Sequence, residues 1–281
     1  MRLVCFLWGV AALPACSTAH IGGDDVGGPD ACATCEEDAA PVRPPWQPDP
    51  GTSWQWQLTG TIDMSYAVRM YDIDLFDAPQ AVIDQLHSEQ RKVICYFSAG
   101  TVEPGRPDAA SFPAAAIGSA VGDKPDQRWL DVRNSDVRAA LRGRLDRARD
   151  RGCDGVEPDR VDGFTASSGF PLTAEHQLDF NRFLADEAHA RGLSIGLKND
   201  LAQVPDLVAS FDWAMAVDCL SPGTCAQAMP FVDNDKAVFH VEYGLSELSA
   251  ETICSDSNTF GFETLVKHRE VDAWRIPCRA D

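Results

Sequence analysis

The acidic residues best placed to do chemistry lie in one short run, from Asp154 to Asp162. Within it, Glu157 and Asp159 are two positions apart, so both side chains point to the same side of a β-strand. A buried carboxylate without a partner is costly, and a cluster of carboxylates therefore indicates a cationic ligand, a shared proton or a metal ion. Asp162 lies further along, and we expect it to serve a turn rather than the chemistry.

Other short apolar runs also end in polar residues, and these would meet Glu157 and Asp159 if the runs are neighbouring parallel strands. Carboxylates beside aromatic rings, with no Ser or Cys nucleophile motif and no histidine base, favour glycoside hydrolysis. That reaction uses one carboxylate as nucleophile or base and a second, protonated carboxyl group as acid. The polar residues in question are Asp72 and Asp74, Tyr96 and Ser98, Lys198 with Asn199 and Asp200, Asp218, and Glu242 with Tyr243.

Structural roles are the alternative for several of these residues. Asp72 and Asp74 could cap a following loop, and for Asp72 we favour that interpretation. Lys198 could neutralise the carboxylate cluster, and a lysine in that place would also shift the pKa values of its neighbours. Tyr96 and Tyr243, at strand ends, are the better candidates for stacking on a sugar ring.

A parallel sheet covered by helices is the scaffold predicted by apolar runs that alternate with amphipathic stretches. About eight such repeats fit between residues 47 and 281, which matches the size of a (β/α)8 TIM barrel, where functional residues gather at the C-terminal strand ends. A doubly wound open sheet is the alternative, but the sequence lacks the Gly-rich phosphate loop that it favours. The predicted strands are Trp54–Leu58, Met70–Leu75, Val93–Phe97, Gly155–Glu157, Ser194–Leu197, Trp213–Val217, Ala237–Tyr243 and Ala273–Ile276.

Three of the helices have ends that can be recognised in the sequence. One is predicted to be capped by Ser135 and ended by Gly152, and a second to be capped by Thr173 and ended by Gly192. A third has Pro79 in its first turn. One face of the first helix is predicted to carry Val137, Leu141, Leu145 and Ala148, and the inward face of the third Val82, Ile83 and Leu86. The second helix is predicted to run through Phe183 and Leu184.

The N-terminal residues are predicted to direct export. Arg2 precedes an apolar stretch, residues 3–13, that is too short to span a bilayer and is typical of a signal peptide. Residues 13–16, Leu-Pro-Ala-Cys, resemble a bacterial lipobox, in which Cys16 would be lipidated; ordinary secretion is the alternative. Residues 17–50 are rich in Gly, Asp, Pro and Ala and are predicted to be a flexible linker. The folded domain would then span residues 51–281, in a protein that is secreted or is a cell-surface lipoprotein of the bacterial envelope.

The cysteines fit an oxidising compartment. Those of the folded domain could pair as Cys95–Cys153, Cys219–Cys225 and Cys254–Cys278, although sequence alone leaves the connectivity open. Cys32 and Cys35, in the linker, favour a local disulfide over redox or metal chemistry. The six histidines are scattered, with no paired zinc-ligand spacing. We therefore expect no metal and no organic cofactor.

The charge balance limits the choice of partners. With 24 Lys and Arg against 43 Asp and Glu, the formal net charge is −19. Such a surface repels nucleic acid and anionic lipid headgroups and attracts cationic ligands. Contact with a membrane would then depend on a lipid anchor at Cys16, and we expect a monomer. The alternative is that the charge only keeps an exported protein soluble.

Five ordered segments resemble glycoside hydrolase family 114, and the resemblance runs from about Trp54 to Cys278. It implies a TIM barrel and an endo-α-1,4-polygalactosaminidase activity with a retaining double displacement. The implied substrate is a deacetylated, hence cationic, galactosamine polysaccharide, and Asp159 matches the catalytic Asp of the family. The segments are Asp72–Asp77, Lys92–Gly100, Gly152–Asp159, Gly196–Asp200 and Val241–Tyr243.

The sequence departs from the family at its second catalytic carboxylate. Members usually carry a Glu within an Asn-Glu-Gln-Cys motif, but here residues 216–219 read Ala-Val-Asp-Cys, with Val217 at the Glu position. Asp218 is one residue away and would face the other side unless the strand bulges or ends early. Glu242 is expected in the barrel mouth and could serve as the acid. Two hypotheses follow, an active glycosidase with a displaced acid and a catalytically impaired glycan-binding barrel.

Overall fold

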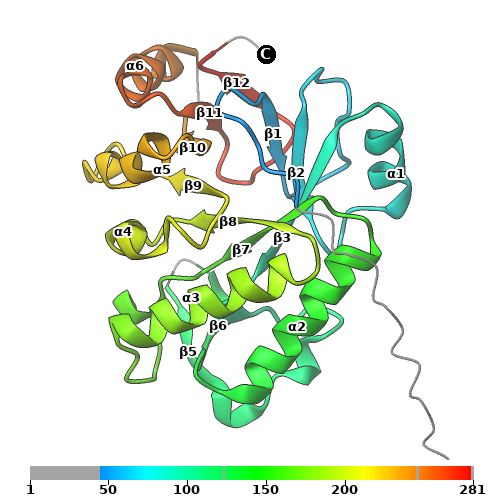
Figure 1. Ribbon diagram of the computed structural model, residues 1–281, viewed down its shortest axis with the longest axis vertical. Coiled ribbons are helices and arrows are strands. Elements are labelled where there is room, and N and C mark those ends of the chain that lie inside the picture. Colours follow the sequence, from blue (N-terminus) through cyan, green and yellow to red (C-terminus); the bar gives the residue numbers. More distant parts are fainter. Residues whose placement is uncertain (1–44, 123, 245–246, 280–281) are drawn as a thin grey trace, which may run out of the picture. The chain divides into compact units, whose positions relative to one another are not determined.

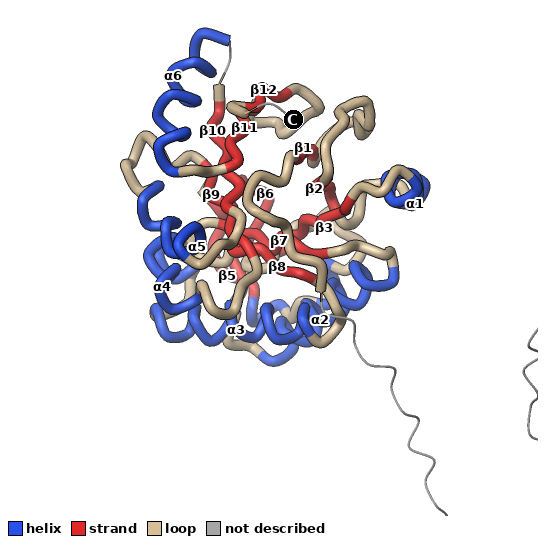
Figure 2. Tube along the Cα trace, turned by 45° about the horizontal axis from the view of Figure 1, so that its top comes forward, coloured by secondary structure: helices blue, strands red, loops and turns tan. Residues whose placement is uncertain are grey.

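A nine-stranded sheet forms the centre of the protein, as seen in a computed structural model that describes residues 45–122, 124–244 and 247–279. Eight strands are parallel and follow one another around the sheet, and the ninth, β12, is antiparallel to β11. Helices surround this inner ring (Figures 1 and 2). In sheet order, the strands are β1 (Trp54–Gln57), β2 (Met70–Asp74), β3 (Lys92–Ser98), β7 (Gly155–Asp159), β8 (Ser194–Lys198), β9 (Trp213–Val217), β10 (Val238–Tyr243), β11 (Glu263–Lys267) and β12 (Arg275–Pro277).

The helices lie mostly between successive strands, as a (β/α)8 barrel requires. The α-helices are α1 (Gln80–Ser88), α2 (Ser135–Asp150), α3 (Ala174–His189), α4 (Val204–Leu207), α5 (Met229–Asp233) and α6 (Glu247–Ser257). Single turns of 3₁₀-helix are η1 (Ala109–Ser111), η2 (Ala114–Ala116), η3 (Gly163–Thr165), η4 (Leu201–Gln203), η5 (Cys225–Ala228) and η6 (Asn258–Phe260). The predicted TIM barrel is confirmed. In the described ranges, no helix is both long and apolar enough to cross a membrane.

The barrel closes through the loop between β11 and β12, because β1 pairs only with β2. The indole N–H of Trp54 donates to the carbonyl of Glu263 at 3.0 Å, and the Gln55 amide donates to the carbonyl of Ala273 at 2.8 Å. The backbone N–H of Leu58 donates to the carbonyl of Val271 at 2.9 Å. Closure therefore depends on a loop and on side chains rather than on a continuous strand ladder.

Alternation along the strands separates two apolar layers. Inward-pointing residues fill the barrel, and outward-pointing residues pack under the helices. Gly196 shows how tight the inner layer is, because a Cβ there would lie 2.3 Å from the ring of Trp213. The inner layer comprises Trp54, Trp56, Met70, Ile94, Trp213, Met215, Ala237, Phe239, Val241, Leu265 and Val271.

Seven of the predicted barrel strands are confirmed and the eighth is wrong. Residues 273–276 overlap β12, which runs antiparallel and stands outside the parallel set. The eighth barrel strand is β11, whose only apolar residues, between Glu263 and Lys267, are Leu265 and Val266. Because its ends are charged, the strand does not stand out as an apolar run in the sequence.

Helix faces are predicted better than helix caps. Thr173 caps α3 as expected, and Val137, Leu141, Leu145 and Ala148 are all buried on one face of α2. Ser135 is not a cap, because the side chain of Asn134 accepts the N–H groups of Asp136 and Val137. Pro79 precedes the first residue of α1 instead of lying within its first turn.

A small antiparallel sheet was not predicted. It consists of β4 (Thr101–Val102), β6 (Lys124–Leu130) and β5 (Ile117–Val121), in that order, inserted between β3 and α2. Four of the seven residues in β6 are charged or amide side chains, and five are not buried, so no apolar alternation marks the strand.

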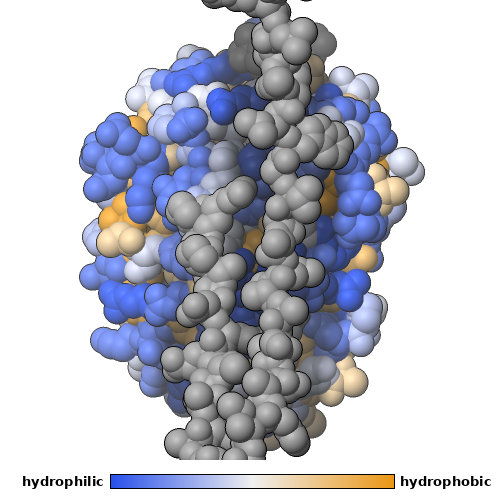
Figure 3. All heavy atoms as spheres, turned by 45° about the vertical axis from the view of Figure 1, so that its right-hand side comes forward, coloured by the Kyte–Doolittle hydropathy of each residue, from blue (hydrophilic) through white to orange (hydrophobic). Residues whose placement is uncertain are grey.

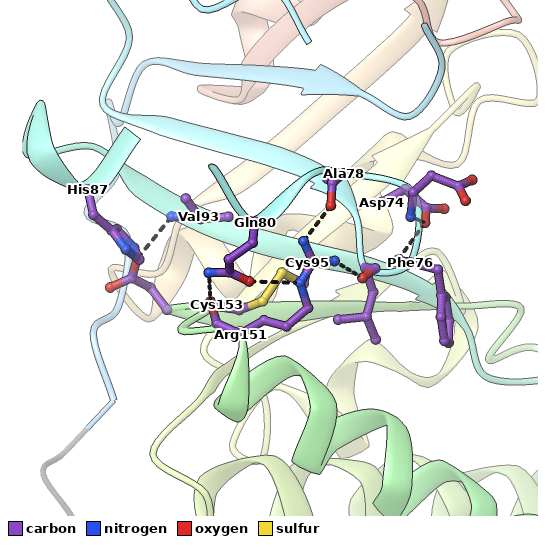
Figure 4. The surroundings of a disulfide bond; sticks show 12 residues. Asp74, Phe76, Ala78, Gln80, His87, Val93, Cys95, Arg151 and Cys153 are labelled. Carbon is purple, nitrogen blue, oxygen red and sulfur yellow. Dashed lines mark hydrogen bonds and ion pairs between the residues drawn. A yellow bond between two sulfur atoms is a disulfide. The ribbon is translucent and has the colours of Figure 1, made fainter. Parts of the chain in front are cut away.

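Three disulfides confirm the suggested pairing of the described cysteines. Cys95–Cys153 joins β3 to the segment before β7, and beside it the guanidinium of Arg151 donates to the carbonyls of Leu75 and Ala78 (Figure 4). Cys219–Cys225 closes a short loop after β9, and Cys254–Cys278 links α6 to the C-terminal segment.

The predicted linker reaches too far along the chain. Trp46 packs against the barrel layer, and the Gln47 amide donates to a carboxylate oxygen of Asp212 at 2.7 Å. The folded part therefore begins before Gly51. The predicted signal peptide, Cys16 and the Cys32–Cys35 pair lie outside the described residues.

Hydrophilic residues cover most of the face visible in Figure 3, with apolar residues in small groups between them. This distribution is ordinary for a folded domain in contact with water. On such a surface, a hollow is a better candidate for a ligand-binding site than an exposed apolar patch.

Candidate active site

A cavity of about 460 Å³ opens at the C-terminal ends of the barrel strands. Every barrel strand from β7 to β10 contributes to it, as do β1, β3 and the loop after β11. This is the position at which barrel enzymes carry their active sites. The lining residues are Trp56, Leu58, Tyr96, Lys124, Asp159, Arg160, Asp162, Lys198, Asn199, Val217, Asp218, Tyr243, Arg269 and Val271.

Asp159, the last residue of β7, is held from three sides. The hydroxyl of Tyr96 donates to its Oδ2 at 3.2 Å, and the backbone N–H of Arg160 donates to its Oδ1 at 2.8 Å. The ammonium of Lys198 lies 3.6 Å from Oδ2. A carboxylate fixed in this way, with one-fifth of its side chain still exposed to the cavity, is suited to attack a bound substrate.

Below Asp159, an ion pair fills the barrel interior. Glu157 is fully buried; its Oε2 accepts the indole N–H of Trp56 at 3.1 Å, and its Oε1 lies 2.5 Å from the ammonium of Lys198. The same ammonium lies over the rings of Trp56 and Tyr96, at 4.5 and 5.0 Å from their centroids. Glu157 and Asp159 thus point the same way, as predicted, but only Asp159 reaches the cavity.

The protonation of Asp72, Glu157 and Lys198 determines the charge balance of the barrel interior. Burial raises the pKa of Asp72 well above its usual range, and the charge of Glu157 raises it further. Burial also raises the pKa of Glu157, opposed by the charge of Lys198 and by the adjacent carboxyl group of Asp72. Although burial opposes its charge, Lys198 has a raised pKa because Asp159 and Glu157 surround it. Burial thus favours the neutral form of Asp72 beside the Glu157–Lys198 ion pair, and the predicted loop cap is wrong, because neither carboxyl oxygen of Asp72 has a hydrogen-bond partner among the described residues.

Two residues predicted to contact substrate are structural instead. Asp74 is bound through both oxygens by the guanidinium of Arg106, at 2.6 and 2.9 Å, and also accepts the backbone N–H of Phe76. Ser98 is buried, with its hydroxyl 2.5 Å from that of Thr101. Neither lines the cavity.

Tyr96, Lys198, Asn199 and Tyr243 do line the cavity, as predicted. Asn199 has a left-handed backbone, with φ of 53°, and its side-chain oxygen accepts the backbone N–H of Val217 at 2.9 Å. Burial raises the pKa of Tyr96 and of Tyr243, so both rings carry neutral hydroxyls. Aromatic rings at the rim of a polar cavity can stack on the apolar face of a sugar.

Val217 and Asp218 both line the cavity, which the alternation of a strand would forbid. Strand β9 ends at Val217, and Asp218 has a left-handed backbone with φ of 58°. Its N–H donates to the carbonyl of Val241 at 2.8 Å, so the turn is fixed to β10. The early strand end that Asp218 required is present. Its carboxylate is nearly half-exposed and lies 3.5 Å from the guanidinium of Arg269.

Glu242 does not lie in the barrel mouth, and that prediction is wrong. It shares the outward face of β10 with His240, and its Oε1 lies 3.0 Å from Nε2 of that ring. The same oxygen accepts the backbone N–H of Leu220 at 2.8 Å. Although burial opposes the charge, these hydrogen bonds lower the pKa of Glu242. It is a buried carboxylate that secures the loop after β9, while Tyr243 takes the inward position.

Among the described residues, one group has the composition of a metal site. Cys219, Cys225, His240 and Glu242 are buried, with candidate ligand atoms within 4.8 Å of one another. The two sulfurs are joined in a disulfide, however, so the thiolates that a zinc ion would need are consumed. The group acts as a structural anchor for the loop after β9.

Two carboxyl groups near Asp159 were not assigned a catalytic or binding role, although Asp200 was named among the strand-end polar residues. Asp162 was expected to serve a turn, yet its side chain lines the cavity. Asp200 is buried close behind, where the charge of Asp162 reaches it. Both follow a strand end by three or fewer residues, the position at which barrels carry functional groups, and this signal was used for Asp200 but not for Asp162.

The cavity itself is less acidic than the whole chain. Its walls carry three carboxylates against four cationic side chains, so the cavity is not an acidic cleft. The excess negative charge of the chain therefore lies outside the cavity wall, from where it can act at long range but not through direct contact. The carboxylates are Asp159, Asp162 and Asp218, and the cations are Lys124, Arg160, Lys198 and Arg269.

A (β/α)8 barrel with a fixed carboxylate at its mouth is the architecture of many carbohydrate-active proteins. The family model for glycoside-hydrolase family GH114 matches residues 36–281. The chain belongs to this family. It is similar to a crystal structure of Aspergillus fumigatus Ega3 in complex with galactosamine, with a TM-score of 0.80 and 36% sequence identity. The match covers 84% of this chain and 98% of that one.

The glycoside hydrolase domain of PelA from Pseudomonas aeruginosa has the same fold. Its TM-score is 0.63 at 14% identity, over 80% of this chain and 96% of that chain. At that identity the likeness concerns the fold alone. No curated protein matches the sequence.

Proposed function

We propose that the protein is an exported glycosidase that cleaves α-1,4-linked galactosamine polymers with retention of configuration. The observation that carries this proposal is Asp159, placed at the mouth by Tyr96, Lys198 and the N–H of Arg160. Membership of GH114 and the similarity to Ega3, whose structure contains galactosamine, support the substrate class.

In the proposed reaction, a carboxylate oxygen of Asp159 forms a bond to the anomeric carbon. The bond from that carbon to the glycosidic oxygen breaks, and the leaving oxygen receives a proton from an acid. Water then attacks the same carbon, its proton passes to the conjugate base of that acid, and Asp159 leaves with its electron pair. The net change is hydrolysis of one glycosidic bond.

The charge distribution supports a cationic chain as substrate. With a net charge of −19, the protein attracts a polymer of protonated amino sugars from a distance, although the cavity walls are nearly balanced. Such attraction is screened by salt. We therefore expect kcat/KM on the polymer to fall as ionic strength rises from about 10 to 200 mM, while kcat changes little.

The second candidate function, a glycan-binding barrel without turnover, is favoured by one observation. Val217 faces the cavity at the place where the family resemblance puts its catalytic Glu, so the usual acid is missing. Loss of an acid removes about 10²- to 10⁴-fold from the rate.

Reducing ends released from partially deacetylated α-1,4-galactosamine oligomers test both candidates. The wild type should release them, and Asp159→Asn should not, while both bind the oligomers in calorimetry. Asp84→Asn, an exposed substitution on α1, is the matched control and should behave as wild type. If the wild type binds the oligomers but releases no more ends than Asp159→Asn, the glycan-binding function replaces the enzyme.

A further inference from the structure

Asp162 lines the cavity although it stands at a turn. It precedes the 3₁₀ turn η3, but its carboxylate makes no capping hydrogen bond. The turn is held by its backbone carbonyl, which accepts the N–H of Thr165 at 3.0 Å and the hydroxyl of the same residue at 2.9 Å. The turn therefore does not need the carboxyl group, which lines the cavity together with Asp159.

Asp200 lies behind Asp162 with only 4% of its surface exposed. Its Oδ2 accepts the side-chain N–H of Asn181 at 2.8 Å, and its Oδ1 is buried with no hydrogen-bond partner among the described residues. The Asn181 amide also donates to the carbonyl of Val161 at 3.0 Å. One asparagine on α3 thus braces the two segments that carry the two carboxyl groups.

The backbone conformation of Asp200 is also unusual. Asp200 has a left-handed conformation, with φ of 47°, which is unfavourable for a residue with a Cβ. Strained conformations of this kind occur where surrounding structure imposes them, often at functional sites. Here the imposed conformation keeps a carboxyl group buried beside Asp162 instead of exposing it to water.

The charges that face Asp162 come from three sides. Asp159 and Arg160 belong to its own segment, Lys198 belongs to β8, and Lys124 of β6 lines the same cavity. Burial raises the pKa of Asp162, the charge of Asp159 raises it further, and Arg160 and Lys198 partly oppose the change.

The pKa of Asp200 is also raised. Burial, followed by the charge of Asp162, raises the pKa of Asp200 to about 8. Two carboxyl groups that interact in this way titrate as a pair, in two steps. At neutral pH the pair holds a proton next to Asp159. Asp218 offers no comparable store, since it is nearly half-exposed and paired with Arg269.

We propose that Asp162 is the proton donor of the reaction, and that Asp200 is a positioning residue that keeps a proton available to it. This inference rests on the proposed function. In the first step the proton moves from the Asp162 carboxyl group to the glycosidic oxygen as the C–O bond breaks. In the second step the Asp162 carboxylate takes a proton from the attacking water as the bond to Asp159 breaks.

Leaving-group dependence tests the proton donor directly. The substrates are the galactosamine polymer and a 2,4-dinitrophenyl α-1,4-galactosamine disaccharide, whose leaving group needs no proton. Asp162→Asn should lose about 10²- to 10⁴-fold in kcat/KM on the polymer but release the dinitrophenol in a burst close to wild type. Azide should then accelerate turnover of the accumulated intermediate. Asp159→Asn should fail on both substrates.

Two further variants separate catalysis from folding. Asp162→Glu keeps a carboxyl group and should recover part of the activity on the polymer. Asp200→Asn leaves one titrating carboxyl group instead of two, so the alkaline limb of kcat/KM should move to lower pH. Asp84→Asn should leave that limb unchanged, and circular dichroism should show that every variant is folded.

The outcomes distinguish a failure of the proposed glycosidase function from a failure of the role assigned to Asp162. If the wild type acts on neither substrate, the proposed function fails and the role of Asp162 fails with it. If the wild type is active but Asp162→Asn loses equally on both substrates, or keeps its activity on the polymer, only the role of Asp162 is refuted. Leaving-group dependence in Asp218→Asn instead would assign the proton to Asp218.

Discussion

Removing the ammonium of Lys198 should destabilise the barrel strongly, and Lys198→Met is the perturbation that shows it. Lys198 is 6% exposed, and its ammonium lies 2.5 Å from an oxygen of fully buried Glu157. With an effective dielectric constant of about 20, the attraction at that distance is about 7 kcal/mol, part of which desolvation of the two charges cancels. Methionine preserves the length of the chain but leaves Glu157 without its cation.

The expected loss is about 3–5 kcal/mol in the free energy of unfolding, the usual cost of breaking a buried pair. Urea unfolding followed by circular dichroism, with an unchanged m-value, measures it. The matched control is Lys92→Met, because Lys92 pairs with Asp154 at 2.7 Å while 38% exposed. That surface pair should contribute at most about 1 kcal/mol.

A double-mutant cycle sharpens the test. Adding Glu157→Gln to Lys198→Met removes both charges, so the double variant should recover much of the lost stability. The deficit of Lys198→Met should also shrink as pH falls toward 5, because the isolated Glu157 can then be protonated. A loss no larger than that of Lys92→Met would refute the view that this pair supports the barrel interior.

The remaining predictions concern parts remote from the cavity. Asn134→Ala should cost about 1 kcal/mol of unfolding free energy in urea titrations through loss of the α2 cap, whereas Ser135→Ala should cost little. Replacing both cysteines of Cys254–Cys278, a span of 24 residues, by serine should cost about 3 kcal/mol, measured the same way. A hydrogen bond to the Asp212 carboxylate raises the pKa of His189, so the stability difference between wild type and His189→Gln should be full below the unfolded pKa of about 6.5 and be lost as pH rises through the higher folded pKa; a difference constant from pH 5 to 9 would contradict this.

The strand order could be predicted because buried parallel strands are nearly continuous apolar runs. Strand β11 was missed because Glu263 and Lys267 flank only two apolar residues, Leu265 and Val266. Lys267 faces the barrel interior and donates to the carbonyl of Asp272, a contact that depends on the loop before β12. Long-range partners of this kind leave no local mark in a sequence.

The candidate site was predicted in position but not in detail. Tyr96, Asp159 and Lys198 follow from strand ends, whereas the error at Glu242 was one of strand face. The sequence of β10 contained the signal, because His240 and Glu242 alternate with apolar Phe239 and Val241 and so lie on the opposite face of the strand. Polar residues on both faces of a strand end cannot all point into one cavity.

Backbone conformation decided the rest. Asp218 reaches the cavity because it adopts a left-handed turn bound to Val241, and Asp162 does so because its turn uses only the backbone. No single-residue propensity forces either arrangement. Both are products of neighbouring segments that become adjacent only in the folded barrel.

The loop between β11 and β12 closes the barrel through the carbonyl of Val271, and the same loop supplies Arg269 and Val271 to the cavity wall. Sequence changes there cannot adjust ligand preference without also touching the seam of the scaffold. The β5–β6 hairpin, which reaches the cavity through Lys124, has no part in that seam. Diversification of specificity, by natural drift or in a designed library, should therefore be tolerated at the hairpin and resisted at the closing loop.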